Sequence, residues 1–120
     1  MKKMDDLEKQ ITEAEDALFK EDYEKAFSII NPLVVKDEPA ALGLLGLMYQ
    51  IGMGVDRDLS RAVKLLTSAC EKGNGTAAHN LGTIYEMGEE EIPKDHEKSK
   101  MYYRKAKELG AQFAPDDFYE

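Results

Sequence analysis

The chain has 120 residues, which is room for a single domain in most folds. Its 42% hydrophobic residues suffice for a core and exclude a chain that is disordered throughout. The formal charge of −8 disfavours nucleic acid as a partner, because phosphate binding requires a basic face. A single cysteine, Cys70, excludes both an intramolecular disulfide and a metal site built from cysteines alone.

The N-terminal residues do not have the pattern of a secretory signal. Asp5, Asp6 and Glu8 stand where a signal peptide needs about 7–15 apolar residues. The longest stretch without a charged residue, 39–55, is shorter than the ~20 residues of a membrane span, and glycines interrupt it. We therefore expect a cytoplasmic protein that does not bind membranes.

Helical periodicity predicts six helices, in chain order at residues 4–20, 22–35, 39–51, 58–72, 75–87 and 95–109. In the third, Ala41, Leu45 and Tyr49 recur at helical spacing, and Gly52 is suited to end the helix. Asp58 is placed to cap the fourth helix with its carboxylate. No segment shows the strict alternation of a strand, so we expect an all-α fold.

Aligning the chain with itself shows about three copies of one two-helix unit. Residues 77–88 match residues 41–52 at an offset of 36, and beyond the glycine the offset becomes 37. Residues 22–30 match 58–66 in the same way, whereas the front half of the first copy is degenerate. Helix hairpins repeated at this period predict a short α-solenoid. The expected single domain, 1–120, comprises a degenerate first hairpin (1–38), two repeats (39–74 and 75–111) and a capping tail (112–120).

Small residues recur on the predicted helices of both complete repeats. They are Gly46, Ala62, Ala69 and Gly82. Two helices of a short hairpin approach closely only where the side chains between them are small. We therefore expect these positions to lie between the paired helices.

The repeat closely resembles a known family. Read from Ala41, the pattern AxxxLGxxYxxGxGVxxDxxxAxxLLxxAxxxG is similar to the Sel1-like repeat, a relative of the tetratricopeptide repeat. The second copy keeps LG at residues 81–82, Tyr85, Gly88, IPKD, YYRKA and Gly110. The resemblance covers residues 39–111 strongly and 5–38 weakly, where DYEKA looks more like a tetratricopeptide hairpin. It implies an adaptor that binds other proteins, without a catalytic motif.

The chain departs from the secreted members of this family in its cysteine content. The resemblance implies that those members bridge the helices of each repeat with a disulfide. Here the counterparts of Cys70 one repeat away are Val34 and Lys107. This departure disfavours a periplasmic location.

A second apolar stripe on the helix that begins at Pro39 is a candidate binding surface. Met48 and its counterpart Ile84 are both large and apolar, which is typical of packing positions. The other positions of this stripe differ between the copies: Leu44, Leu47 and Ile51 correspond to Asn80, Thr83 and Met87. Positions that vary on a repeating scaffold are suited to determine binding specificity. We therefore predict a partner site on the inner face, with Gln50 and Glu86 at its edge. It comprises Leu44, Leu47, Gln50, Ile51, Asn80, Thr83, Glu86 and Met87. In the alternative interpretation, Leu44 and Leu47 only pack against the first hairpin.

The residues with metal-binding or nucleophilic chemistry do not form a motif. His79 and His96 have no second ligand at a metal-site spacing. The family resemblance implies that the position of Cys70 is usually filled by alanine, which indicates a small buried residue rather than a nucleophile. We therefore predict no catalytic residue, metal or cofactor. The run Glu89–Glu91 is either a solvated loop or a contact for a basic partner.

The tail after Gly110 is too apolar for a solvated end. We expect Phe113 and Phe118 to fold back on the last hairpin, because a solenoid needs its terminal apolar face covered. In the alternative, the tail is an acidic, aromatic peptide that docks elsewhere. So few repeats are consistent with a monomer or a weak dimer.

Three functions remain from the sequence. The first is an adaptor that binds another protein. The second is an inhibitor, such as an immunity protein for a basic toxin, because an acidic chain associates rapidly with a basic partner. The third, a hydrolase using a carboxylate or Cys70, has the weakest support because no nucleophile–base pair is visible.

Overall fold

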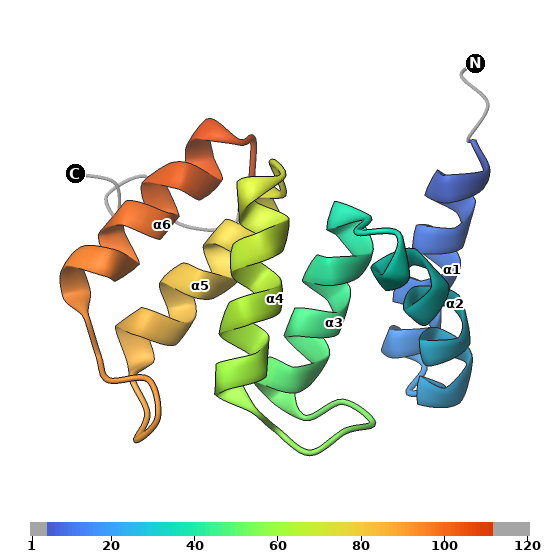
Figure 1. Cartoon of the computed structure of the whole chain (residues 1–120), viewed down its shortest axis with the longest axis horizontal. Helices are drawn as coiled ribbons and strands as arrows, with labels where there is room; N and C mark the ends of the chain where they lie inside the picture. Colours follow the sequence, from blue (N-terminus) through green and yellow to red (C-terminus); the bar gives the residue numbers. More distant parts are fainter. Residues whose placement is uncertain (1–4, 112–120) are drawn as a thin grey trace.

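In the computed structural model, which describes residues 5–111, six α-helices follow one another. They are α1 (Asp6–Phe19), α2 (Tyr23–Val35), α3 (Pro39–Ile51), α4 (Leu59–Glu71), α5 (Gly75–Met87) and α6 (His96–Glu108). Every helix lies within two residues of its predicted bounds, and the described residues contain no strand. The prediction of an all-α repeat fold is therefore confirmed. Figure 1 shows the helices side by side in chain order, from α1 and α2 at one end to α6 at the other.

The helices pack as three hairpins, α1–α2, α3–α4 and α5–α6, that stack on one another (Figure 1). The first helices of the hairpins also approach each other, α1 against α3 and α3 against α5. Among residues 5–111, the second helices α2, α4 and α6 do not approach one another in this way. The stack is therefore tighter along α1, α3 and α5, which form its inner layer.

Each helix start has a local cause in the sequence. The Asp58 carboxylate accepts a hydrogen bond from the Arg61 N–H at 3.1 Å, which confirms its predicted role as a cap. Asp95 does the same for α6 with the Lys98 N–H at 3.0 Å. Helix α3 has no side-chain cap and begins with Pro39, whose missing N–H is not needed at a first position. At its other end, Gly52 adopts φ 86°, a conformation that glycine enters without the steric cost of a Cβ atom.

Glycines allow the two complete hairpins to close. A Cβ atom on Gly46 would lie 2.7 Å from Leu66 of the facing helix, and one on Gly82 would lie 2.8 Å from the ring of Tyr103. Ala62 and Ala69 of α4 have no exposed surface. The expectation that small residues lie between the paired helices is confirmed for Gly46, Ala62 and Gly82, and Ala69 is buried.

Two apolar clusters form the core, and α3 belongs to both. Ala41 and Met48 pack into the cluster of the first hairpin, whereas Leu42 packs into the cluster around α4 and α5. Both Met48 and Ile84 are buried, as predicted for packing positions. Helix α3 is apolar on almost every side because it joins the degenerate hairpin to the two regular ones. Within the described residues, no helix combines the length and the apolarity needed to cross a bilayer.

Candidate protein-binding surface

The predicted partner residues line two hollows between the inner helices α3 and α5. The first hollow, of about 90 Å³, is closed at one side by α1 and contains Leu44 and Leu47. Asn80 of α5 faces them across the hollow. The complete lining is Ile11, Glu15, Ala40, Gly43, Leu44, Leu47, Asn74, Thr76 and Asn80.

The second hollow lies at the loop end of the same two helices and is larger, about 220 Å³. Ile51 and Met87, the last residues of α3 and α5, remain 58% and 72% exposed there. Large apolar side chains exposed together are unusual on a water-facing surface and mark interaction sites. The complete lining is Gln50, Ile51, Arg57, Leu59, Thr83, Ile84, Met87 and Glu89.

Seven of the eight predicted residues are therefore brought together in two groups. Leu44, Leu47 and Asn80 share the first hollow. The second contains Gln50, Ile51, Thr83 and Met87. Leu44 also packs against the cluster of the first hairpin, so it contributes to the core as well.

The eighth residue, Glu86, lies outside both hollows. Its carboxylate accepts a hydrogen bond from the Tyr103 hydroxyl at 2.6 Å, and Thr83 lies 3.2 Å from the same hydroxyl. Tyr103 is only 4% exposed, and it occupies the repeat position of Leu66. A hydroxyl at a buried position requires a partner, so Glu86 is engaged in the last hairpin. Aligning the second helices of the two repeats shows this change from leucine to tyrosine, so the need for a hydrogen-bond partner could have been predicted from the sequence.

His79 belongs to the same polar cluster. Its ring centroid lies 5.4 Å from that of Tyr103, at a tilt of 54°. Burial lowers the pKa of His79, while the Asn80 side chain and Glu86 act in the opposite direction. Among residues 5–111, no group of three or more His, Cys, Asp and Glu side chains is arranged to hold a metal ion.

The sequence analysis missed Arg57 at the rim of the second hollow and considered its partner Glu89 only as part of an acidic run. The Arg57 guanidinium pairs with the Glu89 carboxylate at 2.9 Å and also donates to the Gln50 carbonyl at 3.1 Å. Arg57 and Glu89 are 32 positions apart in the sequence, and their pair joins the α3–α4 loop to the α5–α6 loop. The sequence contains one weak indication of the role of Arg57: a basic residue precedes the capping aspartate in both repeats, as Arg57 and as Lys94.

Gln50 contributes a buried acceptor to the second hollow. Its Oε1 atom is inaccessible to solvent and has no hydrogen-bond partner among the described residues. Leaving such an atom unsatisfied costs about 1–3 kcal/mol. The sequence analysis placed Gln50 at the edge of the site, whereas the structure buries its side-chain oxygen.

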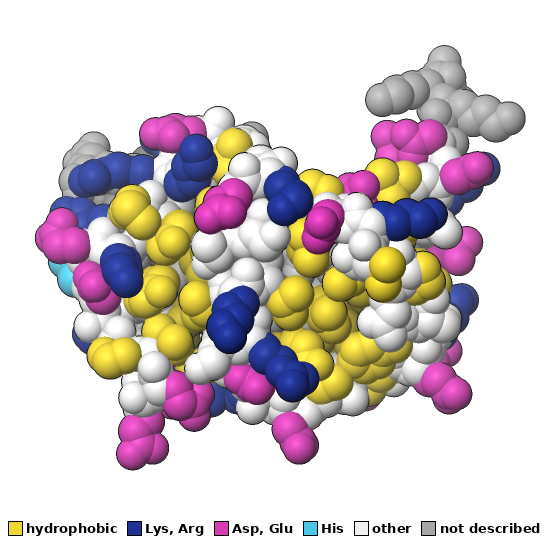
Figure 2. Space-filling model, viewed as in Figure 1, with side chains coloured by type: hydrophobic (Ala, Val, Ile, Leu, Met, Phe, Trp, Pro, Cys, Tyr) yellow, Lys and Arg dark blue, Asp and Glu magenta, His cyan; other side chains and the backbone are white. Residues whose placement is uncertain are grey.

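Acidic residues concentrate in the loops beside the second hollow. Residues 52–58 and 88–95 contain six acidic and two basic side chains, a net charge of −4 out of −8 for the chain. In Figure 2, acidic side chains stand along the lower edge, where Figure 1 places these two loops. Arg57 is already paired with Glu89, so the remaining charge of this edge is strongly negative.

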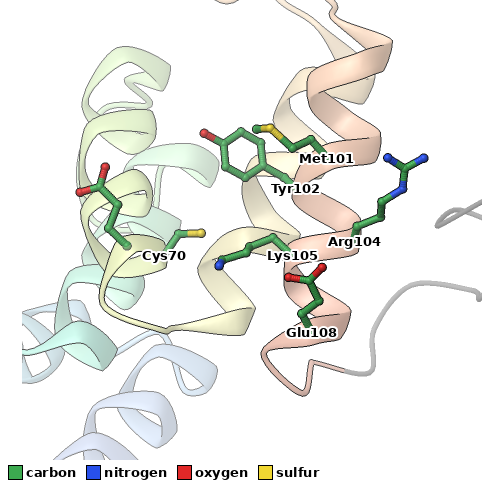
Figure 3. Close-up of a pocket in the computed structure, with 7 residues that line it drawn as sticks. Cys70, Met101, Tyr102, Arg104, Lys105 and Glu108 are labelled. Carbon is green, nitrogen blue, oxygen red and sulfur yellow. The ribbon is translucent and has the colours of Figure 1, made fainter.

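A larger groove, of about 450 Å³, lies on the opposite layer between α4 and α6. Tyr102 and Lys105 extend from α6 toward α4, and Cys70 points into the space from α4 (Figure 3). Cys70 is 6% exposed, which confirms the predicted buried position. Burial raises the pKa of its thiol, partly offset by Lys105, so the thiol stays protonated at neutral pH. A protonated, buried thiol is not an activated nucleophile.

Comparison with known proteins identifies the repeats. A family profile described as "Sel1 repeat" matches residues 39–74 and 75–110. The crystal structure of a Sel1 repeat protein from Oxalobacter formigenes superposes with a TM-score of 0.71 at 31% sequence identity. That superposition covers 82% of this chain and 40% of the bacterial one.

A plant protein shares the repeat at the level of sequence. The ERAD-associated E3 ubiquitin-protein ligase component HRD3B of Arabidopsis thaliana is 40% identical over 70 residues. The match covers 58% of this chain but only 11% of the plant protein. The chain thus spans a small part of this relative and less than half of the bacterial structure.

Proposed function

Because this chain belongs to the Sel1 repeat family, we propose that it is a non-catalytic interaction module that binds a partner protein along α3 and α5. Sel1 repeats generally mediate protein–protein interaction. The observation that carries the proposal is the pair of hollows between these inner helices, one of which leaves Ile51 and Met87 exposed. An apolar groove between helices is a common mode of recognition for a partner helix.

The spacing of the hollows supports a helical partner segment. Leu44 lines the first hollow and Ile51 the second, seven residues apart on α3. At 1.5 Å per residue, this separation is roughly 10 Å, or two helical turns. A partner helix presents residues i and i+7 at the same spacing, so one helix face supplies an apolar side chain to each hollow.

The acidic edge also supports the second candidate, an inhibitor that neutralises a basic protein such as a toxin. Half of the chain's net negative charge lies in the two loops beside the second hollow. Such a surface accelerates association with a basic partner, and the rate then falls with ionic strength. The two candidates differ only in whether the partner loses an activity when bound.

A substitution in the first hollow tests the proposal. Tagged wild-type chain, Leu47→Glu and the control Ser60→Glu, an exposed position on α4, are used to capture proteins from the native cell at low and high salt. We expect wild type and the control to retain the same partner near a one-to-one ratio, and Leu47→Glu to lose it while keeping its helical circular dichroism. A folded Leu47→Glu variant that binds like wild type would exclude this surface. Assays of the partner's own activity then separate adaptor from inhibitor.

A further inference from the structure

The second hollow has the walls of an anchor pocket for a single side chain. Ile51 and Met87 form exposed apolar sides, and Leu59 and Ile84, 2% and 4% exposed, contribute buried surface. Its volume of about 220 Å³ is below the range of roughly 300–1,000 Å³ typical of small-molecule sites. The space therefore suits one large apolar side chain better than a cofactor or metabolite.

Gln50 adds a directional feature to these apolar walls. Gln50 lines the hollow, and its Oε1 atom has no donor among residues 5–111 but is closed to solvent, so a ligand N–H reaches it only after the side chain rotates toward the space. An orphaned acceptor favours a ligand that brings an N–H group with it. Every residue of a peptide other than proline supplies an N–H beside its side chain, so a peptide satisfies both features at once.

The negative charge at the rim of the hollow determines which partner residues are favoured next to the apolar side chain that enters it. Arg57 is neutralised by Glu89, whereas Asp56, Glu90 and Glu91 are exposed in the same two loops. Glu90 follows Glu89 directly, within about 4 Å along the backbone. A cationic side chain close to the apolar anchor is therefore attracted to this rim.

We propose that the second hollow binds a large apolar side chain of a partner segment that carries lysine or arginine within two or three residues. On binding, the Gln50 side chain rotates so that Oε1 accepts a hydrogen bond from an N–H of this segment, and the cation of the segment lies against the rim of Glu90 and Glu91. The inference rests on the proposed protein-binding function and names the chemistry of the partner at that site. The same features exclude an acidic segment, which the net charge of −4 in these loops repels.

Selection of displayed random 12-residue peptides on the wild-type protein tests this assignment. We expect enriched sequences in which a large apolar residue stands close to lysine or arginine. As synthetic peptides, they should bind Met87→Glu at least about tenfold more weakly than wild type. The control Met101→Glu, at a 49% exposed methionine in the groove between α4 and α6, should bind nearly as wild type does.

Two further variants separate recognition from folding. Gln50→Leu removes the orphaned acceptor, so it should unfold at an equal or higher denaturant concentration yet bind the peptides about tenfold more weakly. The double variant Glu90→Gln, Glu91→Gln should lower the affinity and flatten its dependence on salt. Either change without loss of binding would overturn the corresponding part of the proposal.

The outcomes also distinguish this proposal from the general function. Failure to enrich any peptide, or enrichment of peptides that bind Met87→Glu as well as wild type, would overturn the anchor pocket. If Leu47→Glu still loses the native partner while Met87→Glu retains it, protein binding along α3 and α5 stands and the anchor assignment fails. If neither variant affects capture of the native partner, both proposals fail.

Discussion

At the scale of single residues, Gly82 controls the closure of the last hairpin. A Cβ atom at this position would lie 2.8 Å from two ring carbons of Tyr103, a side chain that is 4% exposed. Gly82→Ala therefore overpacks a site without space, and we expect a loss of about 1–3 kcal/mol in the free energy of unfolding. Urea denaturation followed by circular dichroism measures this loss.

Gly43 provides the matched control for that prediction. It also lies inside a helix, but a Cβ atom there would make ordinary contacts of 3.5 Å with the Asn74 side chain. Gly43→Ala should be neutral or should stabilise the protein by up to about 1 kcal/mol, because alanine has the higher helix propensity. Equal losses in both variants would contradict the role of the contact with Tyr103, because helix propensity alone favours alanine at both positions.

His79 makes stability depend on pH in a defined direction. Burial lowers its pKa below the ordinary value near 6.5, so between these two values the unfolded state binds more protons. The stabilising contribution is complete above about pH 6.5 and is lost as the pH falls through the lowered pKa. Proton NMR of the ring should give a midpoint below 6.5, and His79→Gln should weaken the pH dependence of unfolding. A midpoint above 6.5 would show that the attraction of Glu86 outweighs desolvation.

The residue-scale contacts that the sequence analysis did not predict have a common physical cause. The repeat comparison identifies which positions vary, but not which neighbours fill the space around them. Glu86 is predicted at the edge of the partner site, and the structure adds a hydrogen bond from the Tyr103 hydroxyl, because tyrosine replaces leucine on the facing helix. Arg57 and Glu89 meet only through the folding of two loops of different length, which a periodic pattern does not encode.

At the scale of helices, the sequence predicts well because the determining interactions are local. Asp58 and Asp95 cap their helices through N–H groups three residues on. Their own backbone N–H groups donate to the carbonyls of Tyr49 and Tyr85, both at 2.9 Å, which closes each hairpin in the same way. Capping and turn residues act locally and can be identified in a single sequence. The first and last residues of every helix were therefore predicted to within two residues.

Removal of the Asp95 carboxylate measures how much the side-chain cap of α6 contributes to the free energy of unfolding. In Asp95→Ala, the backbone bond to Tyr85 is preserved and only the side-chain cap of α6 is lost. We expect the free energy of unfolding to fall by about 1 kcal/mol, within the usual range of roughly 0.5–2 kcal/mol. Asp56→Ala, in an exposed loop position without a capping bond, should change it by less than about 0.5 kcal/mol. Equal values for the two variants would contradict the capping role.

At the scale of the whole molecule, the repeat geometry continues to the end of the described chain. The turns that leave α2, α4 and α6 are closed by equivalent bonds: Glu38 N–H to Leu33 at 3.0 Å, Asn74 N–H to Ala69 at 3.0 Å and Ala111 N–H to Ala106 at 2.9 Å. In the first two cases a further inner helix follows. The turn at Ala111 thus repeats the turn that precedes α3 and α5.

The sequence after Ala111 partly continues the repeat pattern. Advancing by 37 residues from Ala77 and Leu81, which are both fully buried in α5, gives Ala114 and Phe118. The predicted capping tail, 112–120, lies outside the described residues; in its sequence, Ala114 and Phe118 stand at packing positions of the repeat, whereas Phe113 aligns with the exposed Thr76. Within residues 5–111, α5 is the one helix that packs closely against α6, so the last hairpin presents an unpartnered side.

Deletion of residues 112–120 should therefore lower the melting temperature. Burial of one phenylalanine contributes about 1.5–3 kcal/mol, which corresponds to roughly 5–10 °C for a domain of this size. Phe118→Ala should reproduce most of the loss, whereas Asp117→Ala, one residue away, should not. Differential scanning calorimetry at several protein concentrations also shows whether the shortened chain associates through its uncovered end. An unchanged melting temperature would favour the alternative that these residues dock elsewhere, because a segment that covers an apolar face cannot be removed without exposing that face to water.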